Sequence, residues 1–345
     1  MSGASQEWRT PGIGPGGVAG KQAGSAVGRR SINRAGSPRL LGIFTGQGAQ
    51  RADMAQPWLS HPTTAALFTA ASKILGYDLA EACRYESALA DTRVAQPAIF
   101  MCDLAAYRVL AETGLSPVAV AGHSLGEFAA LVAAGVFEFA PALQLVRDRA
   151  EAMADAAAKQ PGAMAAVLGP GAQEHADAAV RAAGAVGTVV VANFNGPWQV
   201  VLSGSVDAVS QAERVVRDRG GRCSRLPVAG AFHSPLMAAA AARVADAISR
   251  LDWSVPAMPV IPNVTGEPTQ DPSVLAECLR RHLLSPVRWD QTMRSLARLE
   301  VTRIVECGPA RILGSLVHQA LPQIETALVR SPDGAAQHLV PAGVA

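Results

Sequence analysis

The five residues Gly122–Gly126, with the sequence Gly-His-Ser-Leu-Gly, constrain the fold of this chain more than any other segment. They follow an apolar run over 117–121 that is typical of a buried strand, and they precede a run over 127–136 that is typical of a packed helix. A strand, a G-x-S-x-G turn and a helix in this order predict a nucleophile elbow. The glycines allow a sharp turn. The hydroxyl of Ser124 would then lie above the sheet edge, with the first amides of the helix close by.

From residue 40 onward, short apolar segments alternate with segments of helical periodicity, which predicts a mainly parallel α/β sheet. The expected strands cover residues 40–44, 117–121, 163–168, 189–192, 199–202, 223–228 and 303–306. The expected helices cover residues 97–113, 127–136, 141–158, 173–183, 206–219 and 235–250, with a last helix after 309. Between 163 and 228 the order is strand, helix, strand, strand, helix, strand, with a turn at Asn195–Pro197. This order predicts a small ferredoxin-like subdomain inserted into a larger, hydrolase-like α/β subdomain that carries the elbow.

Changes of composition along the chain predict four parts. Residues 1–38 are rich in Gly, Ser, Ala and Arg and have few large apolar side chains, so we expect a disordered tail. Residues 39–160 and 230–328 are expected to form the large subdomain, and residues 161–229 the small one. Residues 329–345 are expected to be a C-terminal tail.

Charge, hydropathy and cysteine usage exclude several classes of protein. A formal net charge of +2 over 345 residues argues against a dedicated nucleic-acid binder. No apolar run approaches the roughly 20 residues that a membrane helix needs, so we expect no membrane association. The five cysteines include no CxxC spacing, which argues against a metal site or a redox motif and indicates a reducing cytoplasm. A monomer is the default expectation.

A serine hydroxyl becomes a good nucleophile only when a base takes its proton, and the seven histidines are the candidates. His123 is expected to point to the opposite side of the elbow, while His233 and His282 remain once the histidines in polar or terminal segments are set aside. His233 lies in a loop directly before a helix that Ser234 caps, a position that suits a catalytic base. On the pattern alone, the alternative of a histidine that only belongs to the capping region stays open.

The helix expected over 141–158 carries a cation on its apolar side. Leu143, Val146 and Met153 recur at spacings of three and four, and Arg149 falls on the same stripe. A guanidinium that points inward needs an anion or a set of acceptors. Two partners fit at this point, namely a buried Asp or Glu side chain and the carboxylate of a bound ligand.

Several further short motifs occur in a fixed order between residues 40 and 325. They are Gly46–Gln50, Gly122–Glu127, Arg149 before Met153, Asn195–Gln199, Gly230–Ser234, Ser285–Trp289 and Glu306–Pro309. Taken together, the chain resembles the malonyl-CoA:acyl-carrier-protein transacylases and the related discrete acyltransferases of polyketide synthases.

This resemblance implies roles for the candidate residues. Ser124 would attack the malonyl thioester and carry the acyl group, while His233 would act as base and then as acid. The backbone amides of Gln47 and Leu125 would form the oxyanion hole, where each donor is typically worth about 2.7–4 kcal/mol. Arg149 would bind the free malonyl carboxylate.

The resemblance also implies three supporting positions. The backbone carbonyl of His282 would orient the catalytic histidine; family members often have Gln there, so the role of the His282 side chain stays open. The sequence Gly-Ala-Phe-His at 230–233 resembles malonyl-selecting members, whereas methylmalonyl-selecting members usually have Tyr-Ala-Ser-His. Phe232 would crowd a C2 substituent, and one methyl group in such a pocket is worth about 1–3 kcal/mol. Asn195 is a further expected substrate contact.

The implied reaction moves malonyl from malonyl-CoA to the phosphopantetheine thiol of an acyl carrier protein, with no bound cofactor and no metal. Both fatty-acid and polyketide biosynthesis fit, and the segment 1–38 tilts the interpretation towards polyketides. The alternatives are a hydrolase that releases acyl groups from carrier proteins, a transferase of a non-malonyl extender unit, and a non-catalytic module that docks carrier proteins. Arg149 argues against the hydrolase, and the presence of both Ser124 and His233 argues against the docking module.

Overall fold

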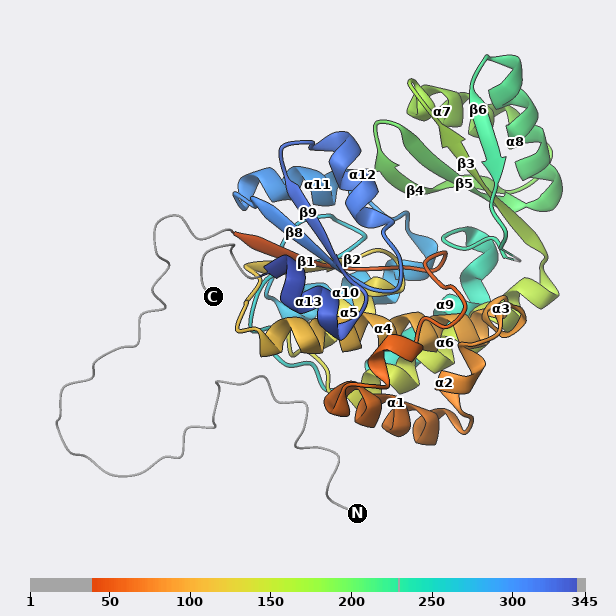
Figure 1. Cartoon of the computed structure of the whole chain (residues 1–345). Coiled ribbons are helices and arrows are strands. Elements are labelled where there is room, and N and C mark those ends of the chain that lie inside the picture. Colours follow the sequence, from red (N-terminus) through yellow and green to blue (C-terminus); the bar gives the residue numbers. More distant parts are fainter. Residues whose placement is uncertain (1–38, 229, 340–345) are drawn as a thin grey trace, which may run out of the picture.

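The computed structural model describes residues 39–228 and 230–339 of the chain (Figure 1). The disordered tail expected over 1–38 lies outside these residues. The described chain is organised around a five-stranded sheet and a four-stranded sheet. The smaller sheet is formed between residues 162 and 225, so it interrupts the chain of the larger one, and the predicted large α/β subdomain with a small inserted subdomain is confirmed.

The larger sheet is parallel throughout and has the strand order β7-β2-β1-β8-β9. Its strands are β1 (Leu40–Phe44), β2 (Ala119–Gly122), β7 (Val260–Ile261), β8 (Arg303–Cys307) and β9 (Glu325–Val329). The register places Phe44 beside Gly122 at the carboxyl ends of the two central strands. The segments that follow these ends hold Gln47 and Ser124. They meet at the edge where open α/β sheets bind their ligands.

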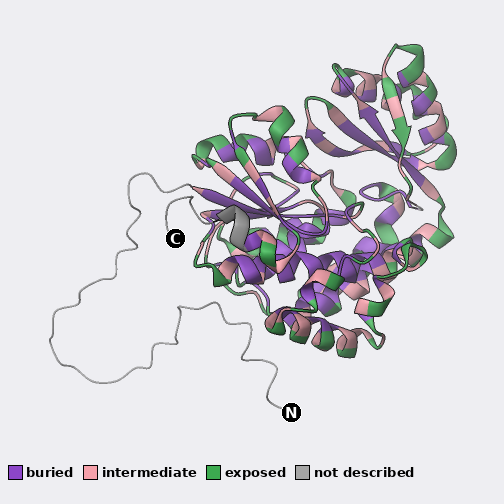
Figure 2. Cartoon of the chain, in the orientation of Figure 1, coloured by how far each residue is buried: buried purple, intermediate pink, exposed green. Residues whose placement is uncertain are grey.

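Both faces of the larger sheet are covered by helices, as the apolar residues of β1 require. Leu41 and Ile43 pack with residues of α11 and α12 on one face, whereas Leu40 and Phe44 pack with residues of α4, α5 and α6 on the other. This alternation follows from the two-residue period of a strand. Figure 2 shows the central strands β1 and β2 and the inner sides of these helices as mostly buried.

The large subdomain contains helices and 3-10 turns (written η) on both sides of its sheet. They are η1 (Gln56–Trp58), α1 (Pro62–Leu75), α2 (Leu79–Ala82), α3 (Glu86–Leu89), α4 (Thr92–Glu112), α5 (Gly126–Ala133), α6 (Phe139–Lys159), η2 (Pro235–Met237), α9 (Ala238–Ser249), α10 (Pro272–Arg281), η3 (His282–Leu284), α11 (Trp289–Arg298), α12 (Leu313–Ala320) and α13 (Pro332–Leu339). Ser234 caps η2 as expected, because its side chain accepts a hydrogen bond from the amide of Leu236.

The smaller sheet is antiparallel with the order β4-β5-β3-β6, the order of a ferredoxin-like unit. Its elements are β3 (Gly162–Leu168), α7 (Ala172–Ala183), β4 (Val189–Gly196), β5 (Gln199–Ser205), α8 (Val206–Asp218) and β6 (Arg222–Arg225). Ala163, Ala165 and Val167 of β3 face α7 and α8. Met164 and Ala166 join the core of the large subdomain, so the inserted sheet is packed on both faces.

Helix α4 begins five residues before the predicted start at Pro97. The side chain of Asp91 accepts a hydrogen bond from the amide of Arg93 and caps the helix, which leaves Pro97 inside it. The helix is also long and apolar enough to cross a membrane by length and composition, contrary to the sequence-based expectation. Of its apolar window, 83% is buried inside the protein, so it forms a core helix.

Two predicted boundaries are wrong. The C-terminal tail expected from residue 329 is structured over most of its length, because Val329 pairs with Cys307 in the sheet and α13 follows at Pro332. Residues 340–345 lie outside the described chain. The turn expected at Asn195–Pro197 falls later, because β4 extends to Gly196 and pairs there with Gln199.

Candidate active site

The elbow has the backbone geometry that its glycines predict. Ser124 has a φ of +51°, a left-handed conformation that a non-glycine residue seldom adopts. A Cβ at Gly122 would overlap the main chain of Gly126, and a Cβ at Gly126 would overlap the carbonyl of Phe44. The turn therefore requires glycine on both sides of the serine, and α5 begins directly after it.

The structure brings His233 onto Ser124 across 109 positions of sequence. The Oγ of Ser124 lies 2.8 Å from Nε2 of His233. The other ring nitrogen, Nδ1, lies 3.0 Å from the carbonyl oxygen of His282 and 3.1 Å from that of Ser285. Two carbonyl acceptors fix the proton on Nδ1, so Nε2 offers a lone pair to the serine hydroxyl. The predicted contact with the His282 carbonyl is confirmed, and Ser285 adds a second acceptor that sequence reasoning missed.

The surroundings of His233 keep its ring neutral. Burial, together with the nearby positive charge of Arg149, lowers the pKa of His233 to about 3. A neutral imidazole is the form that accepts a proton, so the histidine is a base throughout the neutral range. The proton it takes during catalysis would place two positive charges side by side, which favours its rapid release to a leaving group.

Arg149 lies fully buried beside the nucleophile. Its Nη2 donates to Ser124 Oγ at 3.1 Å, and its Nη1 donates to the side-chain oxygen of Gln96 at 2.5 Å. Only 1% of the residue is exposed, and among the described residues no carboxylate lies within 4.0 Å of its guanidinium. Burial lowers the pKa of Arg149 to about 9, which the nearby negative charge of Glu127 partly opposes. The alternative of a direct Asp or Glu partner is thus not what the structure contains.

Below the catalytic pair lies a buried carboxyl group, Glu127 of α5. Its Oε2 accepts a hydrogen bond from the amide of Asn263 at 2.9 Å and lies 3.7 Å from Nε2 of His282. Burial raises the pKa of Glu127 to about 7. The side chain of His282, whose role the sequence left open, packs edge-on against His233 and Phe128. Its ring nitrogens make no hydrogen bond with any residue that the structure describes.

The two amides expected to hold an oxyanion lie at the mouth of the elbow. A Cβ at Gly46 would overlap the carbonyl oxygen of His123, so the turn that holds Gln47 passes against the elbow. Leu125 is the N-cap residue of α5, directly after the nucleophile. Within the described chain, the amides of Gln47 and Leu125 have no hydrogen-bond acceptor. Their oxyanion role stays a prediction.

Asn195 and Phe232 have partners within the protein. The Oδ1 of Asn195 lies 2.8 Å from Nε2 of His123, and its Nδ2 donates to Gln199 Oε1 at 2.7 Å. Both polar ends of this side chain are therefore engaged, so Asn195 supports the elbow from the small subdomain. Phe232 is 8% exposed, and its ring lies against Gly230. Contacts of these two residues with a substrate remain predictions.

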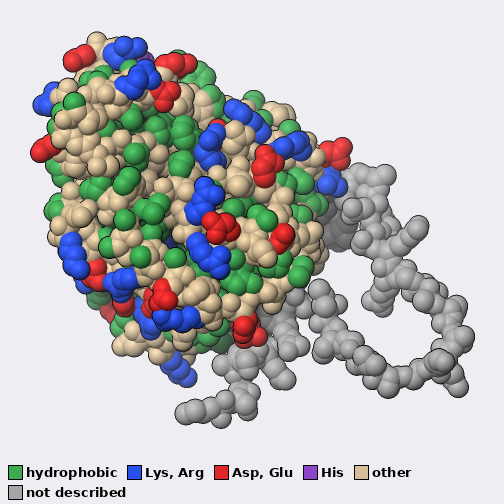
Figure 3. Space-filling model, turned by 180° about the vertical axis from the view of Figure 1, so that it is seen from behind, with side chains coloured by type: hydrophobic (Ala, Val, Ile, Leu, Met, Phe, Trp, Pro, Cys, Tyr) green, Lys and Arg blue, Asp and Glu red, His purple; other side chains and the backbone are tan. Residues whose placement is uncertain are grey.

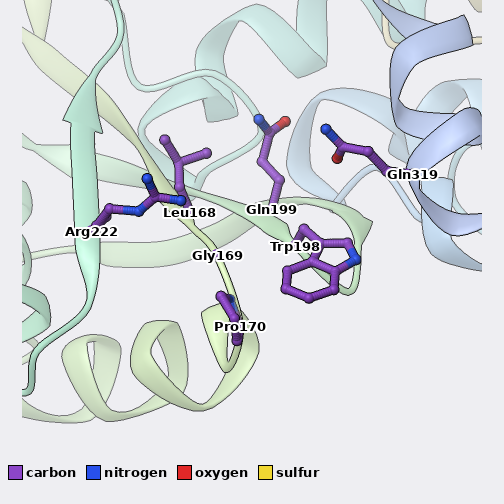
Figure 4. Close-up of a pocket in the computed structure, with 7 residues that line it drawn as sticks. All are labelled: Leu168, Gly169, Pro170, Trp198, Gln199, Arg222 and Gln319. Atoms are coloured by element: carbon purple, nitrogen blue, oxygen red, sulfur yellow. The ribbon is translucent and has the colours of Figure 1, made fainter.

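A pocket of about 550 Å³ opens beside the hairpin of β4 and β5 (Figure 4). Trp198 and Gln199 come from the hairpin, Arg222 from β6 and Gln319 from α12. Since Gln199 binds Asn195 and Asn195 binds His123, two hydrogen bonds connect this pocket to the elbow. On the face shown in Figure 3, basic and acidic side chains are interspersed.

Besides Ser285, sequence reasoning missed two further residues that complete the site. Gln96 accepts from Arg149 and sits within α4, where no motif marks it. Asn263 accepts a hydrogen bond from the amide of Ser124 at 2.6 Å across 139 positions of sequence. A polar residue two positions after the end of β7, at the carboxyl edge of the sheet, is the one signal that could have indicated Asn263.

Comparison with known proteins places this site in a family. Residues 42–342 match the family model described as an acyl transferase domain. The malonyl CoA-acyl carrier protein transacylase of Synechocystis sp. is 37% identical over 82% of this chain and 94% of that protein. The polyketide biosynthesis protein ThaF of Burkholderia thailandensis is 38% identical over 81% of this chain and 24% of that protein.

A solved structure gives the same result. The structure of a type II PKS acyl-carrier protein in complex with its malonyl-transacylase matches with a TM-score of 0.83 and 32% identity, over 87% of this chain and 99% of the matched chain. With its nucleophile elbow, its neutral histidine base and these relatives, the chain belongs to the acyl transferase family.

Proposed function

We propose that this protein is a malonyl-CoA:acyl-carrier-protein transacylase that carries the malonyl group on Ser124. The observation that supports this most is Arg149, a buried cation whose Nη2 lies 3.1 Å from Ser124 Oγ. In a malonyl ester, the free carboxylate would be only a few bonds from that oxygen and therefore close to the guanidinium. The guanidinium can bind a carboxylate with two parallel hydrogen bonds. Relatives that match this chain over nearly their whole length are named malonyl CoA-acyl carrier protein transacylases.

In the first half-reaction, Ser124 Oγ attacks the thioester carbonyl of malonyl-CoA while its proton moves to Nε2 of His233. The carbonyl oxygen becomes an oxyanion, for which the amides of Gln47 and Leu125 are the donors. The intermediate collapses when the carbon–sulfur bond breaks, and Nε2 returns its proton to the departing sulfur. The products are free CoA and a malonyl ester of Ser124.

The second half-reaction repeats these steps in reverse with a different thiol. The phosphopantetheine thiol of an acyl carrier protein gives its proton to Nε2 of His233 and attacks the ester carbonyl. The Ser124 oxygen leaves and takes the proton back, so the enzyme is regenerated and the carrier protein holds the malonyl thioester.

Intact-protein mass spectrometry tests this function. The full chain, mixed with malonyl-CoA, should gain the mass of one malonyl group, and a holo carrier protein added next should remove it from the enzyme and acquire it. The Ser124→Ala variant should gain nothing. A native chain that shows no adduct under these conditions would contradict the proposal.

The same experiment separates the alternatives. A hydrolase would release free malonate and leave the carrier protein unloaded, whereas a transferase of another extender unit would load a substituted acyl-CoA faster than malonyl-CoA. A non-catalytic docking module would bind the carrier protein without any adduct on Ser124. As part of the same proposal we assign the protein to polyketide biosynthesis, which the name of the relative ThaF supports, and to the cytoplasm.

A further inference from the structure

Asn263 lies directly behind the nucleophile and uses every polar group it has. Its Oδ1 accepts from the amide of Ser124 at 2.6 Å, and its Nδ2 donates to the carbonyl of Gly122 at 2.5 Å. Its amide donates to Glu127 Oε2 at 2.9 Å, and its carbonyl accepts from the amide of Arg288 at 2.8 Å. Only 2% of the residue is exposed.

The two side-chain hydrogen bonds hold the backbone on either side of His123, directly before the nucleophile. Gly122 ends the strand before the turn, and Ser124 has the left-handed backbone at its apex. Such a conformation persists only where the surroundings over-determine it. The planar amide of Asn263 supplies that constraint, because it binds one carbonyl and one N–H of the turn. A movement of either group would break one of these hydrogen bonds.

The hydrogen bonds of Asn263 also determine which backbone amides can donate to an oxyanion. The N–H of Ser124 is engaged by Asn263 and cannot point at a reacting carbonyl at the same time. The next amide, that of Leu125, has no acceptor among the described residues. Of the two amides at the apex of the elbow, Leu125 is therefore the one that the structure leaves open.

Asn263 further joins the nucleophile to the segment that orients the base. The amide of Arg288 donates to the carbonyl of Asn263, and Arg288 follows Ser285, whose carbonyl receives the Nδ1 proton of His233. We propose that Asn263 is a positioning residue that sets Ser124 against His233 and, by occupying the Ser124 amide, assigns the elbow's oxyanion donor to Leu125. This proposal rests on Ser124 acting as the nucleophile of the proposed function.

The rate at which a fluorophosphonate labels Ser124 in the full chain tests this role without any malonyl group. Displacement of a reacting group by about 1 Å can cost about 100-fold in rate. We expect Asn263→Ala to slow labelling by about that factor, and to lower kcat for malonyl loading by a similar factor with little change in KM. The matched control is Ser295→Ala, which removes a buried 2.6 Å hydrogen bond to Gly266 in the same loop without touching the elbow, and it should label at the native rate.

Asn263→Asp gives a readout that a general loss of stability would not give. As a carboxylate, this side chain accepts from the Ser124 amide but cannot donate to Gly122; as a carboxylic acid it can do both. The titratable groups nearby are Glu127 of α5, which accepts from the Asn263 backbone amide, and His282 of η3, which lies 3.7 Å from Glu127; the charge of Arg149 of α6 acts on Glu127 as well. Its labelling rate relative to the native protein should therefore rise as the pH is lowered from 8 towards 5.

Two outcomes would overturn the proposal: native labelling rates in a folded Asn263→Ala variant, or a rate ratio for Asn263→Asp that does not change with pH. If Asn263→Ala does not fold, the pH dependence of Asn263→Asp decides alone. The proposed function fails separately. In that case the native protein is labelled by the fluorophosphonate but accepts no malonyl group, and the comparison of variants is unaffected.

Discussion

Replacing Arg149 with methionine removes the cation beside Ser124 and keeps an unbranched side chain of similar length. In the proposed acyl-enzyme, the buried guanidinium of Arg149, whose Nη2 now donates to Ser124 Oγ, would instead bind the malonyl carboxylate. Loss of one partner of a buried, hydrogen-bonded charge pair costs about 2–5 kcal/mol. Since about 1.36 kcal/mol is a factor of ten in rate, kcat/KM for malonyl-CoA should fall about 30- to 5000-fold.

Acetyl-CoA supplies the internal comparison, because its acyl group has no carboxylate. Its rate of loading should fall far less in Arg149→Met, or rise. Stability should change little, because the variant no longer buries a charge whose pKa is lowered to about 9, while Gln96 loses a hydrogen-bond donor. A melting temperature close to the native one would show that the loss of activity is not a loss of fold.

The assay is rapid mixing of full-length protein with each acyl-CoA, followed by intact mass measurement of the Ser124 adduct over time. Arg147→Met is the matched control, because Arg147 stands on the same helix but is 36% exposed and pairs with its neighbour Asp148. It should load both acyl groups at native rates. Equal losses for malonyl and acetyl in Arg149→Met would refute the reasoning, since the cation would then act on the serine and not on the carboxylate.

Three further predictions follow from the site. Phe232→Ala should narrow the preference for malonyl-CoA over methylmalonyl-CoA by about tenfold in competition assays, and an unchanged ratio would exclude Phe232 as the selecting residue. Glu127→Gln should change the pH dependence of the melting temperature, because burial raises the pKa of Glu127 in the folded protein to about 7, above its usual value. The native protein should therefore lose stability relative to the variant as the pH rises from about 4.5 through 7. Melting temperatures that change with pH in the same way for both proteins would contradict this. Arg222→Ala should raise KM for malonyl-CoA about two- to fivefold, with no change for malonyl-pantetheine, because Arg222 lines the pocket and only CoA carries phosphates; equal changes for both substrates would place the phosphates elsewhere.

The parts of the site that the sequence revealed are those with a local signature. Gly122 and Gly126 bracket Ser124 because the turn has no room for a Cβ, and this requirement is visible in five residues. His233 was recognisable because Ser234 and the proline after it mark the start of a helix. Arg149 was recognisable because a cation on an apolar stripe needs an explanation.

The residues that the sequence hid act at a distance. Asn263 follows β7, a two-residue strand that was not predicted, and its partners lie about 140 positions earlier. Gln96 lies in α4, one residue before the predicted start of that helix. The predicted helix started at Pro97, whereas capping by Asp91 extends the helix back to Thr92 and places Gln96 within it.

The C-terminal boundary failed for a different reason. The strand β9 has only five residues, and a short run of mixed polarity has no clear period. It is a strand because β8 offers a parallel partner from Arg303 to Cys307, which only the assembled sheet supplies. Tertiary pairing, more than local propensity, decides such edge strands.

The long sequence separations within the site have a consequence for how the protein becomes active. Ser124 and Arg149 lie 25 positions apart, whereas His233 and Asn263 reach Ser124 across 109 and 139 positions, from beyond the inserted sheet. Helices such as α4 and α6 close through local contacts and form early, whereas closure of loops of a hundred residues or more is slow. A chain that refolds should therefore recover its helical circular dichroism signal well before its serine becomes reactive. A partly folded chain would hold no activated nucleophile that could hydrolyse acyl thioesters.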